Sequence, residues 1–251
     1  MKAAVRRFRQ AHPTWGTRRL VHELRGRFPT LSRSVVRHVL RVARLQQPGP
    51  RRRPRCRHPI PVGRHRVQMD VQTLPAITGG GYEYKSTVIH LRTRLKYSEI
   101  HRDHRSRTLA AVLVRALDRL PPFRLVWTDN AMEFTMRFTA HPERPTAFQQ
   151  RVLALDLLHG TCRPRSPWQN GIVERSHRTD NEECFHVLTF HDNEERRYQH
   201  RLFEMYYNTQ RPHQGLDGHT PFAVYQREYP LHATTRMLGA PPVNMAKRGT
   251  S

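Results

Sequence analysis

The chain contains 251 residues, with 44 Lys and Arg against 20 Asp and Glu, and its formal net charge is +24. This length allows one medium domain with one or two small ones and a sizeable core. No apolar run approaches membrane-spanning length, and the N-terminus lacks the apolar core of a signal peptide. We therefore expect a soluble intracellular protein rather than a helical membrane protein.

The positive charge is concentrated at the N-terminal end. Residues 1–66 hold 19 Lys and Arg against the single acid Glu23, whereas residues 67–251 hold 25 against 19. A module this basic is expected to bind nucleic acid strongly, because each phosphate that it neutralises releases counterions. The asymmetry predicts an N-terminal module that holds a polyanion, and the excess of Arg favours forked contacts to phosphates and bases.

The cysteines indicate a reducing compartment. Cys56, Cys162 and Cys184 are few and far apart, which suits neither a disulfide framework nor a Cys-x-x-Cys zinc pair. The N-terminal histidines do not combine with Cys56 at the spacing of a zinc module. The 17 histidines are therefore expected to be solvated or to face phosphates.

Residues 1–47 are predicted to be helical. Apolar residues within 20–28 recur at helical spacing, and Ser32 or Ser34 can cap a second helix over 35–43. Two short basic helices joined by a tight turn predict a helix-turn-helix DNA-binding segment. The alternative is a basic helical arm that follows the phosphate backbone without reading bases. The candidate DNA contacts of this segment are Arg18, Arg19 and Arg37.

Residues 48–66 are rich in Pro and Arg and predict an extended basic linker, either solvated or lying along DNA. From residue 67 the pattern becomes that of a mixed α/β domain. Strands are predicted at 67–71, 84–91, 95–100 and 123–128, and helices at 109–120, 148–158 and 171–187. This order fits a mixed sheet covered by helices.

Three carboxylates in this domain predict a shared site. Asp70 lies in the first strand, Asp129 follows the last predicted strand, and Glu174 lies one turn into the final helix. If those two strands are neighbours, Asp70 and Asp129 share the sheet edge where α/β folds place their sites. The flexible start of the helix at Asn170-Gly171 would let Glu174 approach them. Singly, each acid also fits a plainer role as a capping, turn or surface residue.

Carboxylate oxygens are the ligands that Mg²⁺ prefers, with the remaining positions taken by water and phosphate. Two such ions, about 3.5–4 Å apart, activate an attacking hydroxyl and stabilise the leaving oxygen. The expected reaction is phosphodiester cleavage or transfer by in-line displacement.

Three segments resemble the signatures of bacterial insertion-sequence transposases: TDNAMEF at 128–134, SPWQNGIVERSHRT at 166–179 and YYNTQRPHQGLDGHTPFAVY at 206–225. HPTWGTRRL at 12–20 is similar to the helical DNA-binding segment that precedes the core in many of these enzymes. The resemblance covers residues 67–225 and leaves 226–251 as a C-terminal tail. It implies a retroviral-integrase-type (rve) catalytic core with an Asp-Asp-Glu (DDE) triad and a ribonuclease-H-like fold.

Carried over, the resemblance makes Asp70, Asp129 and Glu174 the catalytic and metal-binding residues of a polynucleotidyl transferase. It implies two Mg²⁺ or Mn²⁺ ions, 3′-end cleavage and strand transfer, and a homo-oligomer on the transposon ends and target DNA. The location would be the bacterial cytoplasm, at the nucleoid. Asn130, Ser166, Asn170 and Gly171 match residues that shape the pocket, and Arg211, Pro212 and His213 lie in the trailing motif, where a packing role is expected.

Phosphate or base contacts are expected around the last acid. Trp168 could stack on a base or pack, and solvated surface charge is the alternative for the arginines. The candidate DNA contacts of the core are Arg163, Arg165, Trp168, Asn170, Arg175, His177 and Arg178.

Two departures from the family pattern leave alternatives open. Ala131 replaces the usual Gly and would be strained if that position needs a positive φ. The stretch between Asp129 and Glu174 is longer than usual, with the surplus expected at 135–145. Related transposases often carry further helical modules before the core. A truncated or inactive copy that only binds DNA, and a nuclease of the same fold without strand transfer, are therefore the alternatives.

Overall fold

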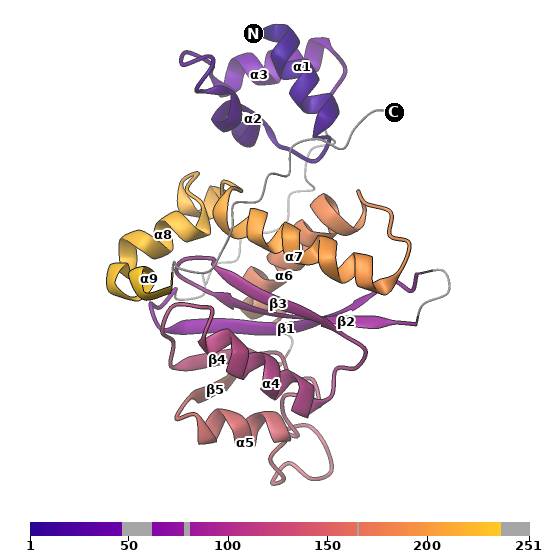
Figure 1. Ribbon diagram of the computed structural model, residues 1–251, viewed down its shortest axis with the longest axis vertical. Helices are drawn as coiled ribbons and strands as arrows, with labels where there is room; N and C mark the ends of the chain where they lie inside the picture. The colour runs from indigo at the N-terminus through magenta and orange to yellow at the C-terminus, as the bar shows by residue number, and fades with distance from the viewer. Residues whose placement is uncertain (47–61, 78–80, 165, 237–251) are drawn as a thin grey trace. The chain divides into compact units, whose positions relative to one another are not determined.

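The computed structural model describes residues 1–46, 62–77, 81–164 and 166–236, which form two compact units (Figure 1). The smaller unit contains residues 1–46 and 212–220, and the larger unit contains the rest. The expected linker lies mostly outside the described residues, as do Gly79 and Gly80 and the end of the tail. Among the helices of the described residues, none has both the length and the apolarity to cross a lipid bilayer.

The described part of the smaller unit contains the helices α1 (Lys2–Ala11), α2 (Thr17–Leu24) and α3 (Arg33–Val42), with the 3₁₀ turn Gln214–Leu216. Val5, Leu20 and Val36 are fully buried at the centre of their shared core. The Ser32 hydroxyl accepts a hydrogen bond from the Val35 N–H at 3.3 Å, which confirms one of the two predicted caps.

The larger unit is built on a mixed sheet whose described strands have the order β3-β2-β1-β4-β5. The strands are β1 (Arg66–Leu74), β2 (Glu83–His90), β3 (Lys96–His101), β4 (Leu125–Thr128) and β5 (Leu158–Thr161). β1, β2 and β3 form an antiparallel meander, and β4 and β5 run parallel to β1. The predicted class, a mixed α/β fold with helices on the sheet, is confirmed.

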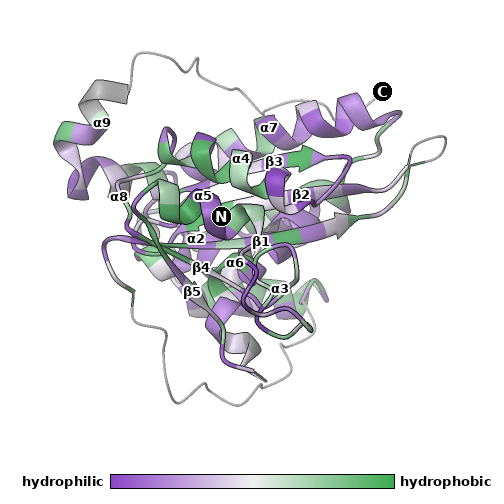
Figure 2. Ribbon diagram, turned by 90° about the horizontal axis from the view of Figure 1, so that it is seen from below, coloured by the Kyte–Doolittle hydropathy of each residue, from purple (hydrophilic) through white to green (hydrophobic). Residues whose placement is uncertain are grey.

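One face of the sheet is apolar and is covered by α4 (Ser106–Leu117) and α5 (Ala147–Ala154). Val67 and Met69 of β1 and Val126 of β4 are completely buried against Leu113 and Phe148 of these helices. Figure 2 shows the hydrophobic residues on α4 and α5. This layer contains most of the core of the larger unit.

The opposite face is covered by α6 (Gly171–Asp180), a π-helical turn (Asn181–Phe185) and α7 (Asn193–Thr209). Here Lys85 of β2 and Lys96 of β3 both donate to the Asp180 carboxylate, and all three side chains are fully buried. The Lys96 ammonium also lies 3.9 Å from the ring centroid of Tyr207. Charged pairs therefore occupy positions that apolar residues fill on the other face.

The described part of the chain ends with the helices α8 (Pro221–Glu228) and α9 (Pro230–Arg236). Tyr225 is buried in the main core, and the Tyr229 hydroxyl donates to the Arg64 carbonyl at 2.5 Å. Arg211, just before this segment, makes two hydrogen bonds to Glu183, at 2.6 and 2.9 Å. The helices extend past residue 225, where the tail was expected to begin.

Several element predictions need correction. The helix predicted over 148–158 ends at Ala154, and Leu158–Thr161 form β5, a strand that the sequence did not reveal. Gly160 lies in this strand and pairs with Trp127, and a Cβ added at Gly160 would lie 2.4 Å from the indole. The long helix predicted over 171–187 changes to π-helical geometry after Asp180.

Candidate active site

The pairing of β1 with β4 sets the position of the two aspartates. The paired residues Arg66–Leu125, Val67–Val126 and Gln68–Trp127 are each 59 positions apart in the sequence, and so are Asp70 and Asp129. Continued past the end of β4, this register puts Asp129 beside Asp70. Because strand side chains alternate, both acids are on the same face of the sheet as Gln68, which contacts α6.

Glu174 lies in the first turn of α6, where the side chain is exposed. The helix is tied to β1 through Gln68, whose amide donates to the Gln169 carbonyl at 2.6 Å and accepts from the Val173 N–H at 3.0 Å. The start of α6 is therefore held against the strand that carries Asp70.

The three acids interact electrostatically. Burial, followed by the negative charge of Asp129 and then that of Glu174, raises the pKa of Asp70 to about 7. Burial also raises the pKa of Asp129, although the Ala131 N–H donates to this carboxylate at 3.1 Å. The same three charges act on the buried Cys162 thiol. The structure thus brings the three carboxylates into one region, where the charges of Asp129 and Glu174 disfavour ionisation of Asp70.

A divalent cation suits this donor set chemically, because three carboxylates supply hard oxygen ligands and a cation relieves their repulsion. As the side chains stand, however, no three His, Cys, Asp or Glu residues of the described chain are close enough together to hold a metal ion. The raised pKa of Asp70 fits this arrangement, since uncompensated acids repel one another. Ion binding would require the carboxylates to move closer together.

His177 needs correction as a phosphate contact. Its side chain is only 8% exposed, and Nδ1 lies 3.6 Å from Asp70 Oδ2. Burial and the nearby Lys85 charge hold the pKa of His177 well below its usual value, so the imidazole is neutral. The exposed face of α6 instead carries Glu174, Arg175 and Arg178.

The segment before α6 has both exposed and buried candidates. Arg163 and Trp168 are exposed, and Trp168 retains 47% of its surface. Asn170 is only 4% exposed, so it is poorly placed to touch DNA directly. Arg165 lies outside the described residues.

The turn after β4 is unstrained and tied to the strand beside it. Ala131 does not adopt a positive φ, so the expected cost of replacing Gly does not arise. The Asn130 side chain donates to the Cys162 carbonyl at 2.8 Å, and the Trp127 indole N–H lies 3.2 Å from the Cys162 sulfur. The residue that follows β5 therefore supports the segment that carries Asp129.

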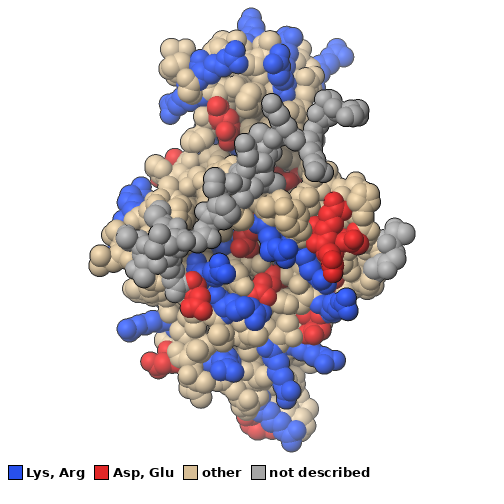
Figure 3. All heavy atoms as spheres, viewed as in Figure 1, with Lys and Arg blue, Asp and Glu red and all other residues tan. Residues whose placement is uncertain are grey.

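In the smaller unit the three candidate arginines differ in their exposure to solvent. Arg18 and Arg37 are exposed, and Figure 3 shows Lys and Arg side chains over the surface of these helices. Arg19 is 6% exposed, with its guanidinium 4.0 Å from the ring centroid of Trp15. It stabilises the fold of this unit, which makes it a poor phosphate contact.

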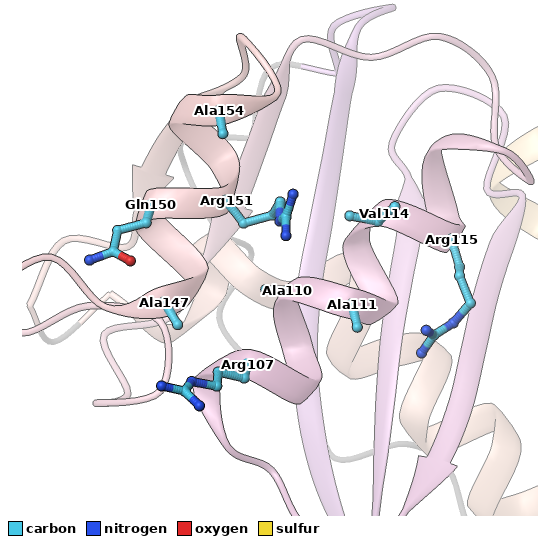
Figure 4. A pocket seen from close by; sticks show the side chains of 9 residues that line it. All are labelled: Arg107, Ala110, Ala111, Val114, Arg115, Ala147, Gln150, Arg151 and Ala154. Atoms are coloured by element: carbon cyan, nitrogen blue, oxygen red, sulfur yellow. The ribbon is translucent and has the colours of Figure 1, made fainter.

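A groove of about 730 Å³ lies elsewhere, between α4 and α5 on the apolar side of the sheet. Figure 4 shows Arg107, Arg115 and Arg151 around a floor of alanines, with no acid among the lining residues. Arg115 is already paired with Glu99. The groove lacks the carboxylates that define the candidate site, and we do not assign it a role in catalysis.

Sequence reasoning missed two sets of residues. Gln68 looked like an ordinary polar strand residue, although its place two residues before Asp70, on the same face, could have suggested contact with a covering helix. Lys85, Lys96 and Asp180 gave no signal, because isolated charges in a sequence suggest exposed positions.

Two family models, both described as integrase core domain, match residues 64–167 and 157–221. The catalytic core domain of HTLV-2 integrase, solved in complex with magnesium, has a similar fold, with a TM-score of 0.50 and 14% identity, over 66% of this chain and 99% of that one. The catalytic core domain of BIV integrase gives 0.47 and 20%, over 69% and 100%. A search of curated proteins found no match.

The two family matches together cover residues 64–221, and the mixed α/β fold of the larger unit is similar to that of a retroviral integrase catalytic core. At the general level, these matches support polynucleotidyl transfer as the activity.

Proposed function

We propose that this chain is the transposase of a bacterial insertion sequence, which cleaves the 3′ ends of the element and joins them to target DNA. The observation that carries the proposal is the register that aligns Asp70 with Asp129, beside a helix whose Glu174 contributes to the raised pKa of Asp70. The matches to the integrase core domain support the same reaction class.

Asp70 and Asp129 would share two Mg²⁺ or Mn²⁺ ions, and Glu174 would complete one of the two sites. When bound, these ions supply activation of the nucleophile and stabilise charge on the leaving oxygen. That a related core was solved with magnesium supports this choice of metal. Asp70 must lose its proton to bind, which its pKa of about 7 allows at neutral pH.

The exposed arginines around Glu174 would hold the phosphodiester backbone, which they can contact in a forked geometry. Trp168, exposed at the start of this helix, would stack on a base at the cut end. The candidate phosphate contacts of the core are Arg163, Arg165, Arg175 and Arg178. In the cleavage step water attacks phosphorus, and the P–O bond to the 3′ oxygen of the element breaks, which frees a 3′ hydroxyl. In the joining step this hydroxyl attacks a target phosphorus, and the 3′ oxygen of the target strand leaves.

The smaller unit would recognise the ends of the element through Arg18 and Arg37, with residues 48–66 as a basic linker to the core at 67–225. Its basic character supports this role. Both ends must be joined together, so we propose a homo-oligomer on DNA, at the nucleoid. The segment 226–251 has no assigned role.

A strand-transfer assay tests the proposal. Pre-cut duplexes with the inverted repeats that the proposal expects on either side of the gene are incubated with target DNA and Mn²⁺. We expect joined products with the wild-type protein and none with Asp129→Asn, which keeps the size of the side chain but removes its charge. If no joined product forms with any metal ion, the result would instead favour an inactive copy that only binds DNA. Hydrolysis of any DNA without joining would favour a nuclease.

A further inference from the structure

The side chain of Gln68 makes an unusual connection between a strand and the end of a helix. It is completely buried, and it bonds to two backbone groups of the segment that leads into α6: the Gln169 carbonyl at 2.6 Å and the Val173 N–H at 3.0 Å. Both the amide NH₂ and the amide oxygen of Gln68 thus form hydrogen bonds with the same turn of backbone.

This turn depends on an external partner. The first N–H groups of a helix have no partner within the helix and are usually satisfied by the side chain of the N-cap residue. Here the N-cap is Asn170, whose side chain makes no capping bond, and its buried Oδ1 has no hydrogen-bond partner among the described residues. Gln68 supplies from β1 the acceptor that the N-cap residue does not.

The connection joins β1 and α6, the two elements that carry Asp70 and Glu174, close to both acids. Gln68 and Asp70 are alternate residues on one face of β1, and Val173 directly precedes Glu174. Further along, His177 lies beside Asp70, and the Gln72 amide donates to the Asn181 side chain at 2.8 Å. Four helical residues rise about 6 Å and two strand residues about 6.6 Å. Contacts therefore recur every four residues along the helical segment and every two residues along β1.

We propose that Gln68 is a positioning residue that fixes the first turn of α6, and with it Glu174, against Asp70. The importance of that placement for metal binding rests on the proposed function. The restraint itself rests only on the hydrogen bonds. Gln72 is a matched control on the same strand face, because it bonds the far end of the same helical segment and is remote from its first turn.

The test compares Gln68→Met with Gln72→Met, two changes that preserve side-chain volume and remove the hydrogen bonds. Hydrogen exchange is measured over residues 169–175 of the metal-free 251-residue protein, and Mn²⁺ affinity is measured by titration. For Gln68→Met we expect exchange to accelerate about tenfold or more in this segment and Mn²⁺ affinity to fall about 10–100-fold. Gln72→Met should leave both near the wild-type values.

Unchanged exchange at 169–175 in Gln68→Met, or an equal change in Gln72→Met, would overturn the proposal. If Gln68→Met fails to fold, as judged by circular dichroism, Gln68→Asn replaces it, because the shorter amide cannot reach both backbone groups. Failure of the wild-type protein to bind Mn²⁺ would contradict the proposed function, and exchange alone would then decide the role of Gln68.

Discussion

The two faces of the central sheet are buried by different kinds of side chain, apolar on one face and charged on the other. Beneath α4 and α5 the strands present Val67, Met69 and Val126, and the layer is held mainly by apolar contact. Beneath α6 and α7 they present Lys85 and Lys96, buried around Asp180. Apolar packing tolerates small shifts, whereas buried charges need partners in a defined arrangement. The candidate site lies on the charged face, where the position of α6 matters.

Removing the central acid should break the charged face most severely. Burial opposes ionisation of Asp180, but the charges of Lys85 and Lys96 outweigh it and lower its pKa. Asp180→Ala leaves two buried ammonium groups without their acid, which should cost about 3–5 kcal/mol of unfolding free energy. Urea denaturation measures this loss. The triple variant Lys85→Met, Lys96→Met, Asp180→Leu should recover it, and a triple variant as unstable as Asp180→Ala would contradict the explanation.

The apolar face should respond to lost volume rather than to lost charge. Leu113→Ala removes a completely buried side chain from α4 and should cost about 2–5 kcal/mol, because the layer can collapse only in part. Leu113→Met, which nearly conserves volume, should cost less than about 1.5 kcal/mol. Equal losses for the two variants would mean that shape, not cavity volume, decides the stability of this face.

At the edge of the charged face, stability should depend on pH through Asp70. Its pKa is raised from 3.8 to about 7, so the folded protein holds this proton more tightly than the unfolded chain does. The resulting penalty is absent below about pH 4 and complete above about pH 7. Asp70→Asn should therefore stabilise the metal-free protein by up to about 4 kcal/mol at pH 8 and have little effect near pH 4.

Thermal unfolding of the two proteins across this pH range gives the difference. Added Mg²⁺ should stabilise the wild-type protein at pH 8 and narrow the gap to Asp70→Asn, since ligand binding stabilises only the protein that binds it. A constant difference between the two proteins from pH 4 to pH 8 would show that the Asp70 carboxylate is not perturbed.

The smallest effect is expected from an ion pair at the rim of the apolar face. Arg115 makes two hydrogen bonds to Glu99, at 2.6 and 2.8 Å, but its side chain is 48% exposed. Water screens such a pair, so Arg115→Gln should cost about 0.2–1 kcal/mol. A loss as large as that of Asp180→Ala would mean that burial does not set the difference between these ion pairs.

The sequence predicted the first three strands, β4, α4 and the fold class because alternation and amphipathic spacing are strong there. β5 was missed because its four residues, Leu-His-Gly-Thr, show no alternation and directly follow an apolar helical pattern. The motifs indicated the three acids, and the register of the parallel strands is what aligns two of them. The burial of His177 and of the two lysines depends on residues distant in sequence, which no local pattern reveals.

The central claim is that Asp70, Asp129 and Glu174 bind divalent cations at one place. Crystals of the wild-type protein with Mn²⁺ and cut-end DNA, measured for anomalous scattering, test it directly. The account predicts a peak between the two aspartates, with carboxylate oxygens at about 2.0–2.2 Å, and its loss in Asp129→Asn. A well-ordered complex in which no peak lies within reach of Asp70 and Asp129 would contradict it.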